Sequence, residues 1–147
     1  MQIGTTRFGT VEIEMRDIVL FPSGLIGYED SRHWVILGDA ENDAVAWLQC
    51  VSGPDLAMPV VSPRRFLPEY QLRVGESQLE PLQLSEVDEA FVLSIMSKSD
   101  DGNLTLNLKA PIIVNLDRRL GRQVITTDDQ PIQHYLTSVP SHLRKSA

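Results

Sequence analysis

The chain has 147 residues, of which 42% are hydrophobic and 22% are charged, and its formal net charge is −7. This size and balance predict one domain with its own core, residues 1–137, and exclude a disordered chain. Residues 1–100 hold 16 acidic and 7 basic side chains. Because such a surface repels phosphate, we expect no direct binding to nucleic acid or to an anionic membrane. It favours a basic protein partner; the alternative is that the charge only keeps the domain dissolved.

Targeting and redox signals are sparse. No apolar run reaches the roughly 18 residues that span a bilayer, and no basic region leads into an apolar core at the N-terminus. The single cysteine, Cys50, has no second cysteine for an internal disulfide, which fits a reducing compartment. We therefore expect a cytoplasmic protein that acts as a monomer.

Strand patterns dominate the first half of the chain. Residues 11–15 read Val-Glu-Ile-Glu-Met, and this alternation of apolar and charged side chains predicts a strand with one face in water. Further strands are predicted at residues 17–21, 33–37, 44–51 and 56–61. The last of these contains Pro59, which has no N–H for the ladder, so we expect this residue at an edge or a bulge.

Two hairpins are predicted in the second half. The Asp-Gly pair in residues 100–103 favours positive φ and marks the first turn, and Gly121 lies near the end of the second. The strands joined are residues 91–96 with 104–108 and residues 112–116 with 123–127. Within them, we expect Phe91, Ile112 and Val114 to be buried in the core.

Helical signals are short. Ser62 and Pro63 offer an N-cap and a first helical residue, and Pro68 stops that helix. Residues 85–88, Ser-Glu-Val-Asp, resemble a capping box with Asp in place of Glu or Gln. About nine short strands with so little helix predict an all-β barrel or sandwich. We favour a small antiparallel β-barrel-like domain with one to three short helices, followed by a flexible tail at residues 138–147.

Residue types that carry chemistry are few and scattered. His33, His134 and His142 lie outside metal-ligand spacing of one another and of Cys50. The sequence contains no nucleophile elbow, no zinc-protease helix and no phosphate-binding loop before a long helix. We therefore predict no cofactor, no metal and no catalytic residue. An enzyme assembled from distant histidines and carboxylates stays open as an alternative.

Five residues are candidates for a protein-binding surface: Leu25, Tyr28, Asn107, Asn115 and Gln123. The first two lie in a glycine-rich loop, where exposed apolar side chains can form a recognition patch. The three amides lie beside the apolar strands of the second hairpin, where strand alternation does not demand them. The alternatives are that the loop plugs one end of the barrel and that the amides satisfy backbone groups at strand ends.

Five segments, in order, resemble those of the flagellar assembly factor family, FliW, and together extend over roughly residues 8–127. The matching stretches are Phe21-Pro22-Ser23-Gly24-Leu25-Ile26-Gly27-Tyr28-Glu29-Asp30, Trp47-Leu48-Gln49-Cys50, Pro54-Asp55-Leu56-Ala57-Met58, Ser62-Pro63-Arg64-Arg65-Phe66-Leu67-Pro68-Glu69-Tyr70 and the stretch from Asn107 to Val124. The chain departs conservatively from the family pattern at Ile26, Tyr28, Cys50 and Met58, which affects details of the loop surface rather than the fold.

The resemblance implies a small β-barrel-like fold, no enzymatic activity, a cytoplasmic location and two protein partners. One partner is newly made flagellin, bound near its C-terminal part. The other is CsrA, a small basic RNA-binding dimer that represses flagellin translation. Excess flagellin would occupy the factor and leave CsrA free to repress; once export drains flagellin, the freed factor would sequester CsrA. The acidic bulk of this chain suits a basic dimer. A small-ligand-binding β-barrel stays open as the alternative function.

Overall fold

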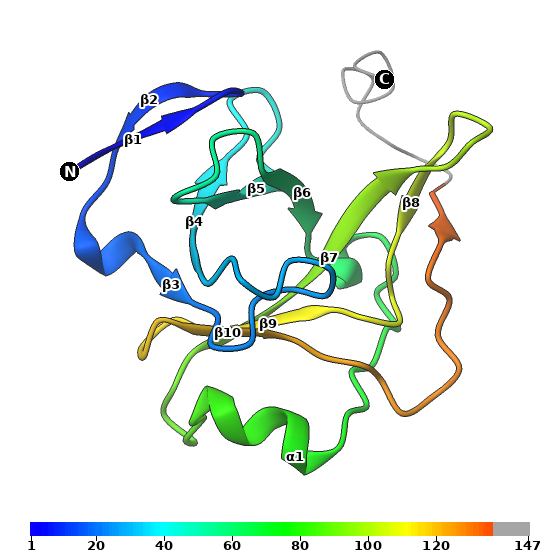
Figure 1. Ribbon diagram of the computed structural model, residues 1–147. Coiled ribbons are helices and arrows are strands. Elements are labelled where there is room, and N and C mark those ends of the chain that lie inside the picture. The colour runs from blue at the N-terminus through cyan, green and yellow to red at the C-terminus, as the bar shows by residue number, and fades with distance from the viewer. Residues whose placement is uncertain (137–147) are drawn as a thin grey trace.

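The computed structural model describes residues 1–136 and is built mainly of short strands (Figure 1). The strands are β1 (Gln2–Thr5), β2 (Gly9–Glu12), β3 (Val19–Leu20), β4 (His33–Gly38), β5 (Val45–Cys50), β6 (Ala57–Val61), β7 (Ala90–Lys98), β8 (Leu104–Leu106), β9 (Ile112–Asn115), β10 (Leu120–Gln123) and β11 (His134–Tyr135). The helical segments are η1 (Met15–Asp17), η2 (Pro63–Arg65), α1 (Glu76–Leu79) and η3 (Glu80–Leu82). The predicted tail, residues 138–147, lies outside the described residues.

The main sheet closes on itself into a barrel. Strand β7 pairs with both β6 and β9, so the order β7–β6–β5–β4–β3–β10–β9 returns to β7. Strands β3 and β10 pair in parallel through Leu20 and Leu120, and the other pairs of the ring are antiparallel. The predicted all-β, barrel-like fold is confirmed.

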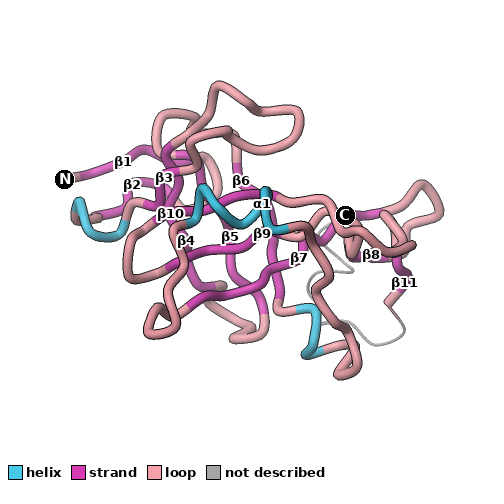
Figure 2. Tube along the Cα trace, turned by 90° about the horizontal axis from the view of Figure 1, so that it is seen from below, coloured by secondary structure: helices cyan, strands magenta, loops and turns pink. Residues whose placement is uncertain are grey.

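The remaining elements surround the ring. The β1–β2 hairpin and the β8–β11 pair lie on opposite sides of it in Figure 1. Helix α1 lies below the ring in Figure 1 and in front of it when the molecule is seen from below in Figure 2.

Antiparallel order gives the barrel two distinct ends. Strands β3, β5 and β10 run toward one end of the barrel, and β4, β6 and β9 run away from it. We call it the loop end, because residues 21–32 cross it. At the other end β6 and β9 finish and β5 and β7 begin; we call it the Asn115 end, after the last residue of β9.

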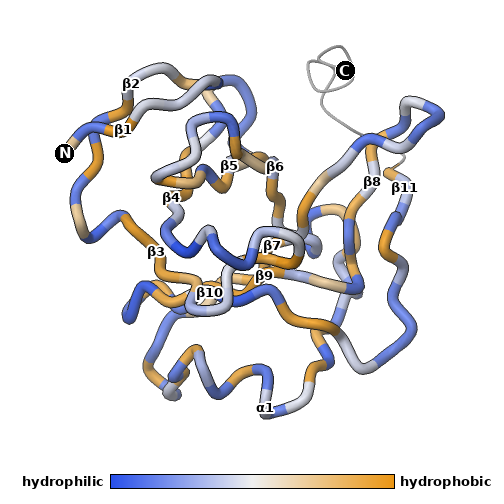
Figure 3. Tube along the Cα trace, in the orientation of Figure 1, coloured by the Kyte–Doolittle hydropathy of each residue, from blue (hydrophilic) through white to orange (hydrophobic). Residues whose placement is uncertain are grey.

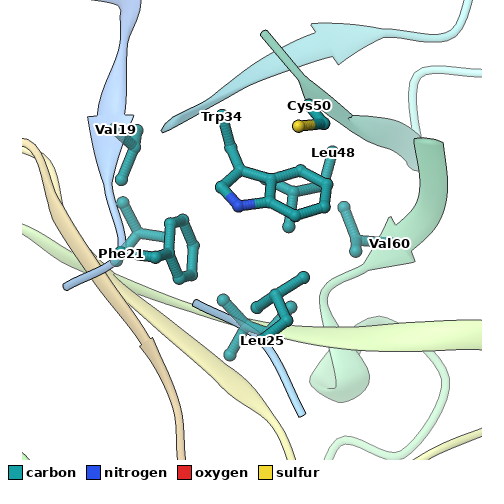
Figure 4. Close-up of a cluster of buried hydrophobic side chains, with 9 residues drawn as sticks. Val19, Phe21, Leu25, Trp34, Leu48, Cys50 and Val60 are labelled. Atoms are coloured by element: carbon teal, nitrogen blue, oxygen red, sulfur yellow. The ribbon is translucent and has the colours of Figure 1, made fainter. Parts of the chain in front are cut away.

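Large apolar side chains fill the interior of the barrel. Trp34, Phe21 and Leu48 are fully buried, and the Phe21 and Trp34 rings meet edge to face with centroids 6.3 Å apart (Figure 4). Ile112 and Val114 of β9 are also fully buried, as predicted. The ring strands are accordingly among the most hydrophobic parts of the trace in Figure 3, whereas many turns are hydrophilic.

The glycine predicted near the end of the second hairpin lies within β10, where packing requires it. A Cβ atom at Gly121 would lie 2.4 Å from Cζ of Phe21, closer than any two carbon atoms can pack. The missing side chain thus makes room for a core ring, which is one of the known uses of glycine inside a strand.

The prediction that Phe91 is buried is wrong. Its side chain is 44% exposed, although its partner across β7–β9, Val114, is fully buried. Phe91 follows the first residue of β7, so it lies at the Asn115 end of the barrel. At that end β6 has already finished, and the chain has turned into η2 at Pro63. Strand β6 therefore does not cover the aromatic ring of Phe91.

The predicted helices are partly right. Segment η2 forms at residues 63–65, where Pro63 takes a first-turn position. Residues 85–88 form a hydrogen-bonded turn instead of a helix: Asp88 N–H donates to the Ser85 carbonyl, and the Asp88 carboxylate accepts from Ser85 N–H. That carboxylate also bonds Asn115, a tertiary contact that competes with helix formation. Helix α1 was not predicted; Gly75 at its N-cap makes no side-chain cap bond that a sequence pattern could signal.

Pro59 limits the β6–β7 ladder. It pairs with Trp47 of β5, whereas β7 pairs with β6 only through Val60 and Val61. Just before β6, the Leu56 carbonyl accepts from the Cys50 N–H of β5. Backbone groups of successive residues point to alternate sides, so the nitrogen of Pro59 faces β7. A proline has no N–H to give there, and the ladder ends. Pro59 therefore lies where the β6–β7 hydrogen bonds end, within a sheet that is otherwise closed. This resembles the predicted edge position, because the proline nitrogen has no strand partner there.

Candidate protein-binding groove

A groove at the loop end of the barrel is the candidate functional site. Its volume is about 430 Å³, and we name it the loop groove. Its lining combines Leu25, Ile26, Tyr28, Met58, Ile95, Asn107, Lys109, Ala110, Gln123, Ile125 and Ile132. The structure therefore brings together four of the five residues selected from the sequence and leaves Asn115 elsewhere.

A tight turn in the glycine-rich loop forms one rim. The backbone N–H groups and carbonyls of Leu25 and Tyr28 bond each other at 3.2 and 2.8 Å, with Ile26 at the tip. Gly24, just before the turn, has a φ of +64°, and a Cβ there would lie 2.5 Å from the Tyr28 carbonyl oxygen. Only glycine fits such a site, so this residue sets the shape of the rim.

The turn divides its side chains between core and solvent. Leu25 is 1% exposed and belongs to the cluster around Phe21 and Trp34 (Figure 4). It plugs the loop end of the barrel, which was the alternative reading of this loop. Ile26 and Tyr28 are exposed and available to a partner. Because its side chain is buried, Leu25 supports its exposed neighbours, and its selection as a contact residue stays a prediction.

Gln123 fastens this turn to the barrel. Its Oε1 accepts from Ile26 N–H at 2.9 Å, and its Nε2 donates to the Ala110 carbonyl at 3.0 Å. One amide therefore holds the tip of the loop to the segment between β8 and β9. The half-buried side chain also lines the groove, so it serves both structure and surface.

Asn107 shapes the floor of the groove. Its Oδ1 accepts from the N–H groups of Lys109 and Ala110 at 3.1 and 2.9 Å, closing a turn between β8 and β9. The Nζ of Lys109 donates to the carbonyls of Thr126 and Asp128 at 2.9 and 2.7 Å. The one charged side chain of the described lining is therefore already engaged with backbone oxygens.

Two further apolar residues of the lining were not predicted from the sequence. Ile125 and Ile132 are both exposed beside the groove. Ile125 is held by Gln78 of α1, whose Oε1 accepts from Ile125 N–H at 2.7 Å and whose Nε2 donates to its carbonyl at 2.6 Å. A polar residue on a four-residue helix gives no sequence signal for such a long-range contact.

Asn115 has a different role, at the opposite end of the barrel. It is fully buried; its Nδ2 donates to the Leu82 carbonyl at 2.9 Å and to the Asp88 carboxylate at 3.1 Å. The hydrogen bond from Asn115 to the Asp88 carboxylate is the main cause that lowers the pKa of Asp88. Hydrogen bonds from Ser85 and the charge of Arg118 also lower this pKa, whereas burial raises it. A buried amide with these partners stabilises the 83–89 loop, and its selection as a contact residue stays a prediction.

The arginines of the β9–β10 hairpin are also engaged internally. Arg119 donates to the Asp17 carbonyl at 2.8 Å, and Arg122 donates to the Gln78 carbonyl at 3.0 Å. Arg118 lies 3.5 Å from the Asp88 carboxylate. These basic side chains tie neighbouring segments to the hairpin, so their clustering in the sequence has a structural explanation.

Side chains that could hold a metal ion do not cluster in the described part of the chain. Among residues 1–136, no three His, Cys, Asp or Glu side chains gather as metal ligands. His33 and His134 do not line the loop groove, and His142 lies outside the described residues. The barrel interior is filled by the core cluster, which counts against a ligand carried inside it. What the loop groove offers is apolar surface for another molecule.

Comparison with known proteins identifies relatives over nearly the whole described chain. The family model for the FliW protein matches residues 2–136. The chain is 40% identical to the flagellar assembly factor FliW of Bdellovibrio bacteriovorus over 88% of this chain and 74% of that protein. It is 34% identical to flagellar assembly factor FliW 2 of Desulfotalea psychrophila over 96% and 94% of the two chains.

A solved structure agrees with these relatives. The crystal structure of a flagellar assembly factor FliW superposes with a TM-score of 0.85 at 31% sequence identity, covering 96% of this chain and 99% of that one. Within residues 1–136, no helix has the length and apolar character needed to cross a membrane.

Proposed function

This chain belongs to the FliW family of flagellar assembly factors, and from that premise we propose that it works by binding flagellin at the loop groove and the regulator CsrA through its acidic surface. As a flagellar assembly factor it acts on other proteins rather than on a small substrate. We infer that it does so in the cytoplasm, as a monomer without enzymatic activity.

The observation that carries the proposal is the exposed apolar rim of the loop groove. Ile26, Tyr28, Ile125 and Ile132 all line the groove and are exposed. Exposed apolar side chains that gather around a concave surface are typical of a protein-binding site, and aromatic residues dominate the energy of such contacts. A flagellin segment with apolar side chains would bury this rim.

The acidic surface supports the second partner. The chain carries a net charge of −7, and the excess of acidic groups lies in residues 1–100. A small basic dimer would be attracted to such a surface, and the attraction would speed its encounter. Partner switching then links export to synthesis: bound flagellin leaves CsrA free to repress translation, and loss of flagellin lets the factor sequester CsrA.

The flagellin site is tested by substituting the rim. Tyr28→Ala and Ile132→Ser should each weaken flagellin binding about tenfold or more, while the melting temperature holds, because both side chains are exposed. Isothermal titration calorimetry with purified flagellin measures the affinity.

Two matched controls do not line the groove. Tyr135→Ala removes a tyrosine that is 49% exposed on β11, and Val87→Ser removes an apolar side chain that is 90% exposed at the Asn115 end. Both should bind flagellin as the parent chain does. If the rim variants keep full affinity, flagellin binds elsewhere on the molecule.

A further inference from the structure

A second groove lies at the Asn115 end of the barrel, and its lining contains an open strand edge. Its volume is about 650 Å³, and we name it the β7-edge groove. Ala90, Phe91 and Val92 of β7 form one wall, and Arg64 and Arg65 of η2 lie on the rim. This is the surface that leaves Phe91 partly uncovered.

A second proline ends the β6–β7 ladder at this side. The pairs Val60↔Ile95 and Val61↔Ser94 set the register, and continuing it would place Pro63 opposite Val92. Pro63 has no N–H to donate, and the chain turns there into η2. The ladder is therefore closed at both limits by prolines, Pro59 on one side and Pro63 on the other.

Beyond that limit, one edge of β7 is unpaired. The backbone carbonyls of Ile95 and Glu89 accept hydrogen bonds from the N–H groups of Asn107 and Leu116. The backbone N–H and carbonyl groups of odd-numbered β7 residues therefore point toward β8 and β9. The backbone groups of even-numbered residues point the other way, toward β6 and the groove. In the described residues, no strand pairs with Ala90 or Val92 on this side. Both residues line the groove, and within residues 1–136 nothing is hydrogen-bonded to their N–H and carbonyl groups on this side.

The charges around the groove differ from those of the molecule. Its charged lining residues are Arg64, Arg65 and Asp43, whereas the whole chain carries −7. The Nε of Arg64 donates a hydrogen bond to the Tyr70 carbonyl at 2.9 Å. Arg65 lies 4.0 Å from Asp43, an exposed and weak pairing that a better anion would displace. The groove thus offers positive charge beside apolar surface and an open edge.

We propose that the β7-edge groove binds an extended segment of a partner protein, which adds a strand to the free edge of β7 at Ala90 and Val92. The added strand places an apolar side chain on Phe91 and an acidic side chain near Arg65. An open edge supplies main-chain hydrogen bonds that do not depend on sequence, and the flanking side chains supply the specificity. This site is separate from the loop groove and does not depend on what binds there.

The probe is a blocked octapeptide that alternates valine and threonine and carries one glutamate. Added to the ¹⁵N-labelled chain, it should slow amide hydrogen exchange at Ala90 and Val92 about tenfold or more at saturation, because their N–H groups become hydrogen-bonded. The same peptide with every amide N-methylated should not bind. Replacing its glutamate by lysine should weaken it about tenfold.

A matched pair of variants assigns the site. Ala90→Pro removes one edge N–H and blocks strand addition at an exposed position, the first residue of β7, where proline is tolerated. Ala90→Val keeps the N–H. We expect about tenfold weaker peptide binding for the proline variant and unchanged binding for the valine variant. Should the proline variant fail to fold, Arg65→Glu takes its place, and it should reverse the preference for the glutamate peptide over the lysine peptide.

Several results would overturn the proposal. They are equal binding by the proline and valine variants, unchanged exchange at Ala90 and Val92, binding of the N-methylated peptide, and no binding at about 1 mM peptide. Protection of the same two amides that rises with protein concentration, without peptide, would instead identify the occupant as a second copy of this chain.

Discussion

Replacing Asn115 by alanine separates a structural amide from a binding residue. The side chain is fully buried at the Asn115 end of the barrel and donates to the Leu82 carbonyl at 2.9 Å. Without it, that carbonyl loses its partner in an environment that water does not reach freely. A buried acceptor left unpaired costs about 1–3 kcal/mol of folding free energy. In a domain of this size, each kcal/mol lowers the melting temperature by about 2–4 °C.

The same substitution has a signature in pH. Because the bond from Asn115 is the main cause that lowers the pKa of Asp88, the variant should let this pKa return toward its ordinary value. A carboxyl whose folded-state pKa is lowered stabilises the fold above its unfolded value of about 3.9 and loses that effect as the pH falls through the folded-state pKa. The difference in stability between parent and variant should therefore be larger at about pH 7 than at about pH 3.

Two measurements on one protein check this reasoning. Urea denaturation at the two pH values gives the free energy of unfolding, and calorimetric titration at a temperature where the variant is folded gives its affinity for flagellin. We expect reduced stability and unchanged affinity. An Asn115→Ala chain that melts like the parent but has lost flagellin binding would refute the structural role and return Asn115 to the binding surface.

Three further outcomes are expected. Ile112→Ala should lower the free energy of unfolding by about 2–5 kcal/mol in denaturant titration, because the residue is fully buried; an unchanged value would show that it is not core. Gly121→Ala should cost about 1–3 kcal/mol in the same assay, because its Cβ would collide with the Phe21 ring, and full stability would mean that the ring can move aside. Association with CsrA should slow as salt rises in stopped-flow measurements, because surface charges are screened beyond about 8 Å at physiological ionic strength; a flat rate would remove the steering argument.

Local patterns in the sequence determine much of this fold. Alternating apolar residues mark the strands, and the turn at residues 100–103 forms as its Asp-Gly pair predicts, with Gly102 at a φ of +88°. Pro59 interrupts a ladder wherever it stands, because a proline nitrogen has no proton to donate. These features depend on a few neighbouring residues, so they are readable without the rest of the molecule.

The candidate site is only partly readable in this way. The glycine-rich loop and the amides attract attention in the sequence, and four of the selected residues do lie in one groove. Their roles depend on which way each side chain points. Leu25 and Asn115 are buried, Tyr28 is exposed, and Gln123 bridges two segments. The rim residues Ile125 and Ile132 carry no local pattern that distinguishes them from strand or loop residues.

What the sequence by itself determined, then, is strands β3 to β9, the turn at residues 100–103 and the ladder limit at Pro59, because these follow from backbone geometry over a few residues. It missed β1 and β11 and placed the strand that follows β9 at residues 123–127 instead of 120–123. What only the tertiary structure decided is how the strands close. Closure puts Asn107 and Asn115 at opposite ends of the barrel and leaves Phe91 beyond the cover of β6. It also sets Gln78 against Ile125, 47 residues along the chain. Such contacts arise from the packing of the whole ring, whose register no single segment contains.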